Sequence, residues 1–188
     1  MSKIKIAIDA GHGWGNVKSG QFDPGATGNG VREADVALDY AKSLKEMLLR
    51  RKVPCHMIVT GLQGDENPVS RRDDEATANG CTHMVSIHCN AFTEGSRGIE
   101  TLYRTPEDKA LAEIMHKATL ASLGLKDRGL FDESRSPHGR LAVFSFPGPN
   151  CLVELGFLTN AEDVRALRDP KRRIAWAEAV ADELAKLK

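Results

Sequence analysis

Two histidines and a glutamate stand where the strands of a parallel sheet would present reactive groups. His12 follows a short β-rich run, and His88 and Glu154 lie at the ends of two other hydrophobic runs. In open parallel sheets, ligand sites lie beyond the carboxyl ends of the strands. We therefore expect these three side chains to meet at one edge of one sheet.

A second glutamate joins them from a helix. Glu33 stands four residues before Ala37 and seven before Tyr40, so it shares the inward-facing stripe of a helix expected to run to about residue 51. As an acid in the first turn, Glu33 could simply complement the helix dipole. A carboxylate on a buried stripe is costly, however, unless it is paired or bound to a metal. Its position therefore favours a functional role.

His12, Glu33 and His88 together make the donor set of a catalytic zinc site, in which two histidines and a carboxylate leave a fourth position open. Each histidine alone has an ordinary explanation, since His12 could bond the backbone of a loop and His88 could be a satisfied residue at a strand end. With Glu154 at the same edge, the metal site is the better interpretation. The chain has no HExxH helix motif, so such a site would be assembled from distant segments.

The elements that must position these residues alternate along the chain. Hydrophobic and β-rich runs predict strands, and apolar residues at helical spacing predict helices between them. This alternation predicts an α/β fold, a mostly parallel twisted sheet of about five or six strands with helices on both faces. We expect one domain over residues 1–188. The expected strands are 4–10, 55–60, 84–91, 98–103, 141–144 and 151–155, and the expected helices are 31–51, 71–79, 105–124 and 172–187, separated by loops that include the glycine-rich stretch 14–30.

Composition excludes several kinds of partner. The 26 basic and 26 acidic residues balance among 188, which argues against electrostatic capture of nucleic acid. No apolar stretch of about 18 residues is present, so no membrane insertion is expected. The first residues lack the features of a signal peptide, and the four cysteines have no CxxC spacing. They are typical of free thiols in a protein made in the cytoplasm.

Four separated motifs resemble one known family. The motifs are DAGHG (9–13), DPGATGNGVREADVAL (23–38), SIHCNA (86–91) and VELGFLTN (153–160). In order and approximate spacing they resemble the zinc-dependent N-acetylmuramoyl-L-alanine amidases of the Amidase_3 type. The resemblance implies one Zn²⁺ per chain, ligated by His12, Glu33 and His88, and Glu154 as general base and acid. It also implies peptidoglycan as the substrate, cleaved between N-acetylmuramic acid and L-alanine.

The departures from this family pattern carry further expectations. The extra stretch WGNVKSGQF (14–22) should lie beside the metal, where Trp14 could stack on sugar or simply pack. The span from His88 to Glu154 has no room for a long inhibitory helix, so we expect no obligate protein activator. We expect residues 1–188 to form a single catalytic domain, without a separate wall-binding domain. Such a bare catalytic domain without a leader resembles a phage or prophage endolysin, a bacteriolytic hydrolase that reaches the cell wall after release.

Other functions remain as alternatives. A dinucleotide-binding fingerprint is disfavoured because Asn16 takes its third glycine position and no helix begins there. A cysteine hydrolase using Cys89 or Cys151 is disfavoured because Cys89 and its neighbour His88 must face opposite sides of a strand. A zinc peptidase cutting within the stem peptide stays open, as does a non-catalytic module that binds zinc or peptidoglycan.

Several further residues are left without a role by the sequence. Asn90, Glu100 and His138 could each border the site, while Arg71 and Arg72 are expected to make salt bridges on a helix.

Overall fold

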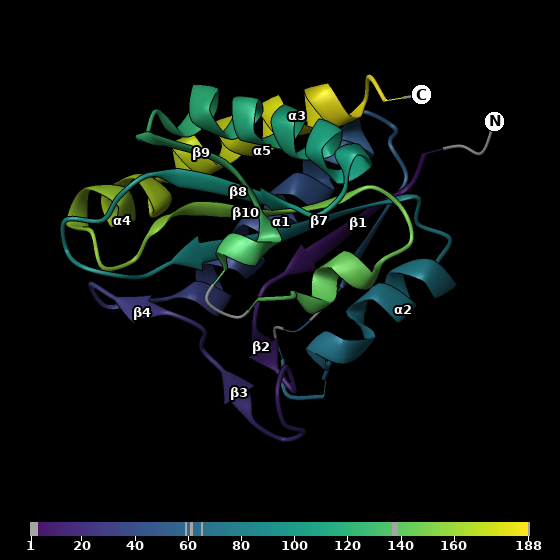
Figure 1. Cartoon of the computed structure of the whole chain (residues 1–188), viewed down its shortest axis with the longest axis horizontal. Coiled ribbons are helices and arrows are strands. Elements are labelled where there is room, and N and C mark those ends of the chain that lie inside the picture. Colours follow the sequence, from purple (N-terminus) through teal and green to yellow (C-terminus); the bar gives the residue numbers. More distant parts are fainter. Residues whose placement is uncertain (1–3, 59, 61, 65, 137–138, 188) are drawn as a thin grey trace.

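A six-stranded sheet forms the centre of the protein (Figure 1). The computed structural model describes residues 4–187 apart from 59, 61, 65, 137 and 138. The strand order is β6-β1-β7-β10-β8-β9, in which β6, β1, β7 and β10 run parallel while β8 and β9 run in the opposite direction. The mostly parallel α/β sheet predicted from the sequence is therefore confirmed. The strands are β1 Ile6–Ala10, β6 Cys55–Ile58, β7 His83–Asn90, β8 Ile99–Tyr103, β9 Asp127–Asp132 and β10 Asn150–Phe157.

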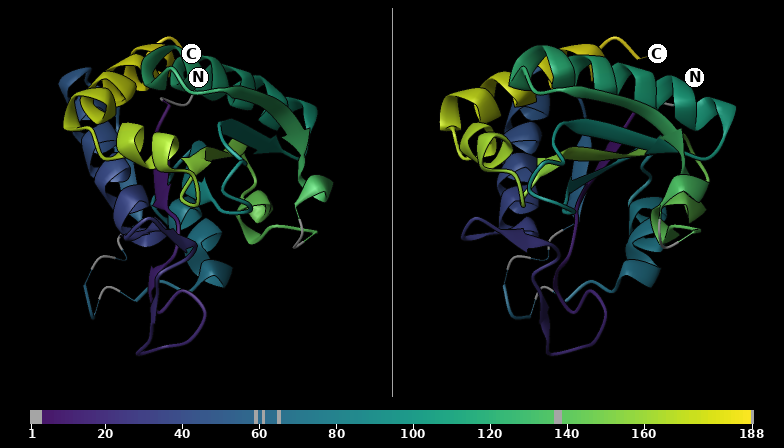
Figure 2. Two further views of the ribbon diagram at one scale, coloured as in Figure 1. Left: turned by 90° about the vertical axis from the view of Figure 1, so that its left-hand side faces the viewer. Right: turned by 60° about the vertical axis from the view of Figure 1, so that its left-hand side comes forward.

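Helices cover the two faces of this sheet unequally (Figures 1 and 2). Three long helices, α1, α3 and α5, lie on one face, which we call the covered face. On the other, the open face, the described residues form α2 and short 3-10 turns. None of the helices in the described part of the chain is long and apolar enough to cross a membrane. The helices are α1 Glu33–Arg50, α2 Arg72–Ala78, α3 Pro106–Leu123, α4 Ala161–Leu167 and α5 Pro170–Leu184, with 3-10 turns η1 Val69–Arg71, η2 Glu133–Arg135 and η3 Ala142–Ser145.

Along each central strand, side chains alternate between the apolar core and the face of the sheet that holds the polar residues. In β7, Val85, Ile87 and Cys89 pack into the main core beneath α1 and α3. The residues between them, including Ser86 and His88, must face the opposite side because side chains alternate along a strand. The open face is therefore where His88 stands, and Cys89 points away from it, as the sequence analysis expected.

Local sequence explains where α3 begins and ends. Thr105 accepts a hydrogen bond from the backbone N–H of Asp108 at 3.1 Å, and the Asp108 carboxylate accepts one from Thr105 N at 2.9 Å, which is a capping box. Pro106 occupies the first turn, where its missing N–H costs nothing. Gly124 ends the helix in the left-handed conformation at φ 63°.

Three short segments differ from the sequence prediction. The run 141–144 is wrong as a strand, because residues 142–145 form the 3-10 turn η3, in which the side chains of Val143 and Phe144 are buried. A short apolar run cannot by itself separate a strand from a buried turn. Strand β9 and helix α4 were not predicted, and β9 takes the sheet edge instead.

The glycine-rich stretch 14–30 is a pair of small hairpins rather than an unstructured loop. Strands β2 Gly13–Trp14 and β3 Phe22–Asp23 pair in one, and β4 Thr27–Gly28 and β5 Val31–Arg32 pair in the other. Both hairpins lie below the sheet in Figure 1, between the end of β1 and the start of α1. They carry the chain from His12 to Glu33.

The helical layer is centred on Trp176 of α5, which predicts a large stability loss on truncation. Trp176 is fully buried, stacks edge-on against Tyr40 at 5.0 Å and donates its indole N–H to Thr119. Trp176→Ala should lower the free energy of unfolding by about 3–5 kcal/mol, as large-to-small core substitutions do. Ile174→Ala, on the same helix but 45% exposed, should change it by less than about 0.5 kcal/mol. Urea unfolding measures both variants, and equal losses in their free energies of unfolding would contradict this packing.

Candidate functional site

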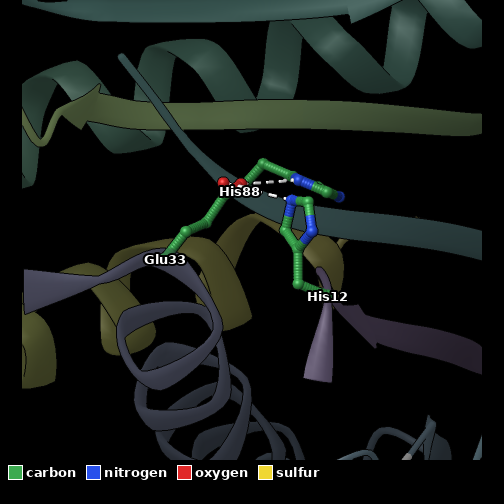
Figure 3. Close-up of side chains that lie close together, drawn as sticks. All are labelled: His12, Glu33 and His88. Atoms are coloured by element: carbon green, nitrogen blue, oxygen red, sulfur yellow. Dashed lines mark hydrogen bonds and ion pairs between the residues drawn. The ribbon is translucent and has the colours of Figure 1, made fainter. Parts of the chain in front are cut away.

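Three separate elements bring His12, Glu33 and His88 together (Figure 3). His12 lies in the turn after β1, Glu33 is the first residue of α1, and His88 lies within β7. One ligand atom from each residue falls within 4.8 Å of the others. His88 and Glu154 belong to the runs 84–91 and 151–155 that were predicted as strands. They lie inside β7 and β10, in register with each other on the open face.

The turn at His12 is a strained piece of backbone. His12 has a left-handed φ of 64°, uncommon for a residue with a side chain, and Gly13 follows at φ 96°. Such conformations persist only where surrounding contacts enforce them, and they cluster at functional sites. A glycine is required nearby as well, because a Cβ on Gly25 would stand 2.5 Å from the His12 ring and 2.6 Å from the Glu33 carboxylate.

The carboxylate of Glu33 is held from four sides. One oxygen accepts from the backbone N–H of Cys89 at 3.0 Å and lies 2.8 Å from His88 Nδ1. The other accepts from Ala26 N at 2.8 Å and lies 3.1 Å from His12 Nε2. The acid predicted for the inward stripe of the helix is thus buried, with both oxygens fixed between the two histidines.

The electrostatics of this cluster favour positive charge. Burial alone would raise the pKa of Glu33, but hydrogen bonds from His12 and His88 outweigh it and hold that pKa well below its usual range. Burial would lower the pKa of His12, yet the carboxylates of Glu33 and Asp23 raise it to about 9. Because the surroundings stabilise a proton on His12 so strongly, they would also stabilise a cation at the same place.

These three residues fit a metal ion. Two imidazoles and one carboxylate are the donor set of catalytic zinc sites with an open coordination position. The side chains of His12 and His88 are 24% and 19% exposed, so the cluster opens to solvent on one side. The cluster is therefore a possible metal site with room for a further ligand.

Asp23 orients the first of these histidines. Its carboxylate lies 2.9 Å from His12 Nδ1, which leaves Nε2 of the ring directed at Glu33. Asp23 is itself held by Asn16 Nδ2 at 2.6 Å and by the backbone N–H of Gly25 at 2.9 Å. A carboxylate behind a ligating histidine fixes its tautomer and ring orientation. The inserted stretch 14–22 thus lies beside the site, as expected.

Arg72, the first residue of α2, makes the salt bridge expected of it on a helix, and its partner Asp9 lies in β1, just before the His12 turn. The side chain of Arg72 is buried and donates to Asp9 Oδ1 at 2.6 Å, to Asn16 Oδ1 at 3.0 Å and to the backbone oxygen of His12 at 2.6 Å. Burial would raise the pKa of Asp9, but the Arg72 guanidinium lowers it below its usual range. The buried pair therefore stays charged and ties β1 to the His12 turn. Arg71, next to it, is exposed.

Glu154 carries an unsatisfied buried atom. Its Oε2 is inaccessible to solvent and has no hydrogen-bond partner among the described residues. Burial, together with the carboxylates of Glu33 and Glu100, raises the pKa of Glu154 well above its usual range. Buried polar atoms without partners are rare and call for an explanation such as a catalytic role. A carboxylate with a raised pKa can both accept and return a proton near neutral pH.

The residues left open by the sequence take several places. Asn90 donates to Glu100 at 2.9 Å, so both belong to the open face beside Glu154. Trp14 packs edge-on against Phe22 at 5.6 Å. His138 lies outside the described residues. Among the cysteines, Cys89 and Cys151 are buried and Cys55 and Cys81 are half-buried free thiols.

Comparisons with known proteins identify one family. The profile described as N-acetylmuramoyl-L-alanine amidase, Amidase_3, matches residues 6–186. The catalytic domain of CwlV, an N-acetylmuramoyl-L-alanine amidase from Bacillus (Paenibacillus) polymyxa var. colistinus, superimposes with a TM-score of 0.82. It is 28% identical, and the match covers 97% of this chain and 96% of that one.

Curated relatives are similar over almost all of this chain. The N-acetylmuramoyl-L-alanine amidase LytC of Bacillus subtilis is 32% identical over 94% of the chain, which corresponds to 34% of LytC. The endolysin of Bacillus phage SPP1 is 30% identical over the whole chain, which corresponds to 66% of the endolysin. The chain thus spans between a third and two thirds of the length of these two relatives.

Asp23 should govern metal affinity without touching the metal. Asp23→Ala removes the group that orients the His12 ring, so zinc affinity should fall roughly 10- to 100-fold. Competition titration with a coloured chelator would measure it. Asp35→Ala is the matched control, since Asp35 pairs with Arg32 at the exposed start of α1. Equal affinity in the Asp23 and Asp35 variants would contradict the assignment.

Arg72 should carry a large part of the stability. Arg72→Met leaves the Asp9 charge buried without its partner, and breaking such a pair costs about 3–5 kcal/mol. Arg71→Met should change the free energy of unfolding by less than about 0.5 kcal/mol because Arg71 is exposed. Urea unfolding monitored by circular dichroism compares the two. A loss at Arg72 no larger than that at Arg71 would show that the buried network is not needed.

Proposed function

Because this chain belongs to the Amidase_3 family of N-acetylmuramoyl-L-alanine amidases, which are peptidoglycan hydrolases, we propose a zinc-dependent mechanism in which Glu154 moves the proton. The chain is an amide hydrolase of that family. The bond cleaved would join the lactyl carbonyl of N-acetylmuramic acid to the amine of L-alanine in the stem peptide. We further propose that residues 1–188 act as one catalytic domain.

His12, Glu33 and His88 would hold the zinc ion. Bound there, zinc would lower the pKa of a coordinated water to about 7 and polarise the scissile carbonyl. The observation that supports these roles best is the position of Glu154 on the strand beside His88, since its buried Oε2 has no hydrogen-bond partner among the described residues. A module that only bound zinc or peptidoglycan would have no use for such a carboxylate.

Glu154 would act first as base and then as acid. It accepts a proton from the attacking water as the new C–O bond forms. It then gives that proton to the alanine nitrogen as the C–N bond breaks, which releases a carboxylic acid and a free amine. The raised pKa of Glu154, caused by burial and by the nearby carboxylates of Glu33 and Glu100, suits both transfers.

We also propose that the enzyme works without a protein activator. The side chains of both histidines in the cluster reach solvent, so substrate can approach without the removal of a covering segment. The setting in which the chain acts stays a prediction. The likeness to a phage endolysin is compatible with a lysin-like role on peptidoglycan, and the likeness to LytC is compatible with wall turnover in bacteria.

Digestion of purified peptidoglycan tests the proposed reaction. The zinc-loaded protein alone should release stem peptides that begin at L-alanine and leave bare glycan strands, both identified by mass spectrometry. A chelator should abolish release, and added zinc should restore it. Cuts within the peptide would move the scissile bond and favour a zinc peptidase. No cleavage by protein that holds stoichiometric zinc would favour a binding module.

Glu154→Gln separates catalysis from binding of the metal. The amide cannot take the proton, so the rate should fall roughly 10²- to 10⁴-fold, the usual contribution of a general acid–base. Zinc content and thermal stability should stay close to those of the parent protein. Glu178→Gln, on the exposed surface of α5, is the matched control and should retain full activity. A Glu154→Gln protein with undiminished activity would remove Glu154 from the mechanism.

A further inference from the structure

A row of polar side chains crosses the open face away from the metal cluster. In the strand register, Glu154 of β10 pairs with His88 of β7 on one side and with Glu100 of β8 on the other. Neighbouring strands lie about 4.8 Å apart, so Glu100 stands roughly 10 Å from His88 along this row. A substrate that lies across the sheet from the cluster must pass over Glu100.

Glu100 holds an arginine at the far end of the row. Arg128 of β9 donates from Nε to Glu100 Oε1 at 2.6 Å, and its guanidinium stacks on the ring of Phe157 with 4.8 Å to the ring centre. Asn90 donates to the second oxygen of Glu100 at 2.9 Å. Both oxygens of Glu100 are therefore hydrogen-bonded. The guanidinium plane of Arg128 is fixed by the hydrogen bond to Glu100 and by stacking on the ring of Phe157.

The outer edge of this guanidinium is available for a ligand. Within the described part of the chain, Nη1 and Nη2 of Arg128 make no hydrogen bond, and the side chain is 30% exposed while Glu100 is 15% exposed. Two parallel N–H groups of an arginine match the two oxygens of a carboxylate. The next residue, Gly129, has no side chain to fill the space beside Arg128. A Cβ added there would meet nothing closer than the Phe131 ring at 3.6 Å.

We propose that Arg128 binds a free carboxylate of the substrate peptide, on the second or third residue beyond the scissile amide. This inference rests on the proposed function, which places the scissile bond at the metal cluster. An extended peptide advances about 3.3–3.6 Å per residue, so roughly three residues span the 10 Å from His88 to Glu100. Arg128 thereby selects peptides with an acidic group at that distance.

The acidic residues near Arg128 affect which anions it can bind. Glu100, whose side chain is 15% exposed, lies in the row that the peptide would cross, so an anionic group bound there needs a cationic partner. Arg128 supplies that partner where the row ends, and its pairing with Glu100 limits its attraction for highly charged anions. A single carboxylate on a peptide fits this balance better than a polyphosphate.

The test compares enzyme variants with peptides of altered charge. The substrates are synthetic N-acetylmuramoyl tripeptides with free carboxylates, and the same peptides with the second-residue or the third-residue carboxylate converted to a carboxamide. For the parent enzyme, one of these amidations should lower kcat/KM by roughly 10- to 100-fold, mainly through KM, as loss of a charge-assisted hydrogen bond does. Arg128→Gln should lose about the same factor on the free acid and should no longer distinguish acid from amide.

Two further variants test whether the geometry and the position of Arg128 are needed. Arg128→Lys preserves the charge but not the two-pronged geometry, so it should recover only part of the preference for the acid. Arg50→Gln is the matched control, because Arg50 also pairs with a glutamate but on the exposed surface of α1, and it should keep the full preference. If Arg128→Gln lowers kcat/KM equally for acid and amide peptides, Arg128 merely positions Glu100 and the proposal fails.

A binding measurement separates this inference from the proposed reaction. The free stem tripeptide, which has no muramoyl amide to hydrolyse, is titrated calorimetrically into zinc-loaded parent and Arg128→Gln proteins. Weaker binding in the variant that disappears on amidation of the peptide supports the carboxylate contact, even if the muramoyl amide is not the bond cleaved. Identical affinities in the two proteins would overturn the contact, while peptidoglycan cleavage by the parent would still stand.

Discussion

The geometry of the site depends on the buried pairing of Arg72 with Asp9. The guanidinium offers five donors in one rigid plane, and it uses them on the side chain of Asp9 and on the backbone oxygens of Ala10 and His12. A further donor reaches Asn16, which in turn holds Asp23 behind the His12 ring. Helix α2, through Arg72, thereby fixes the strained turn that carries His12. The charge of Arg72 can stay buried because the carboxylate of Asp9 offsets it.

The alternation of side chains along the central strands lets one sheet serve two purposes. Cys89 and Val153 belong to the apolar core beneath the long helices, while their neighbours His88 and Glu154 face the open side. Rigid strands hold the reactive groups more firmly than loops would, because each strand is bonded to partners along its length. Glu154 is held in this way with an Oε2 that has no hydrogen-bond partner among the described residues.

Long periodic segments and residue types were enough to predict the fold class and to choose the four residues that the structure gathers. Contacts set by loops were not predictable in the same way. Asp23 lies within a quoted motif, yet only the folded hairpin brings it to His12, and nothing in the spacing of Arg72 distinguishes it from its exposed neighbour Arg71. The edge strand Asp127–Asp132 contains Gly129 at φ 105°, and a glycine within the run hid its β character. Local pattern thus reveals elements and candidate ligands, whereas supporting contacts depend on tertiary structure.

Strand β10 is the last strand to be synthesised, yet it lies between β7 and β8 in the middle of the sheet. A nascent chain that has not reached residue 150 already contains His12, Glu33 and His88 but lacks the strand that joins the two halves of the sheet. Domains complete their folding only when their distant segments are all present. A prematurely terminated product would therefore lack Glu154 and the central strand together.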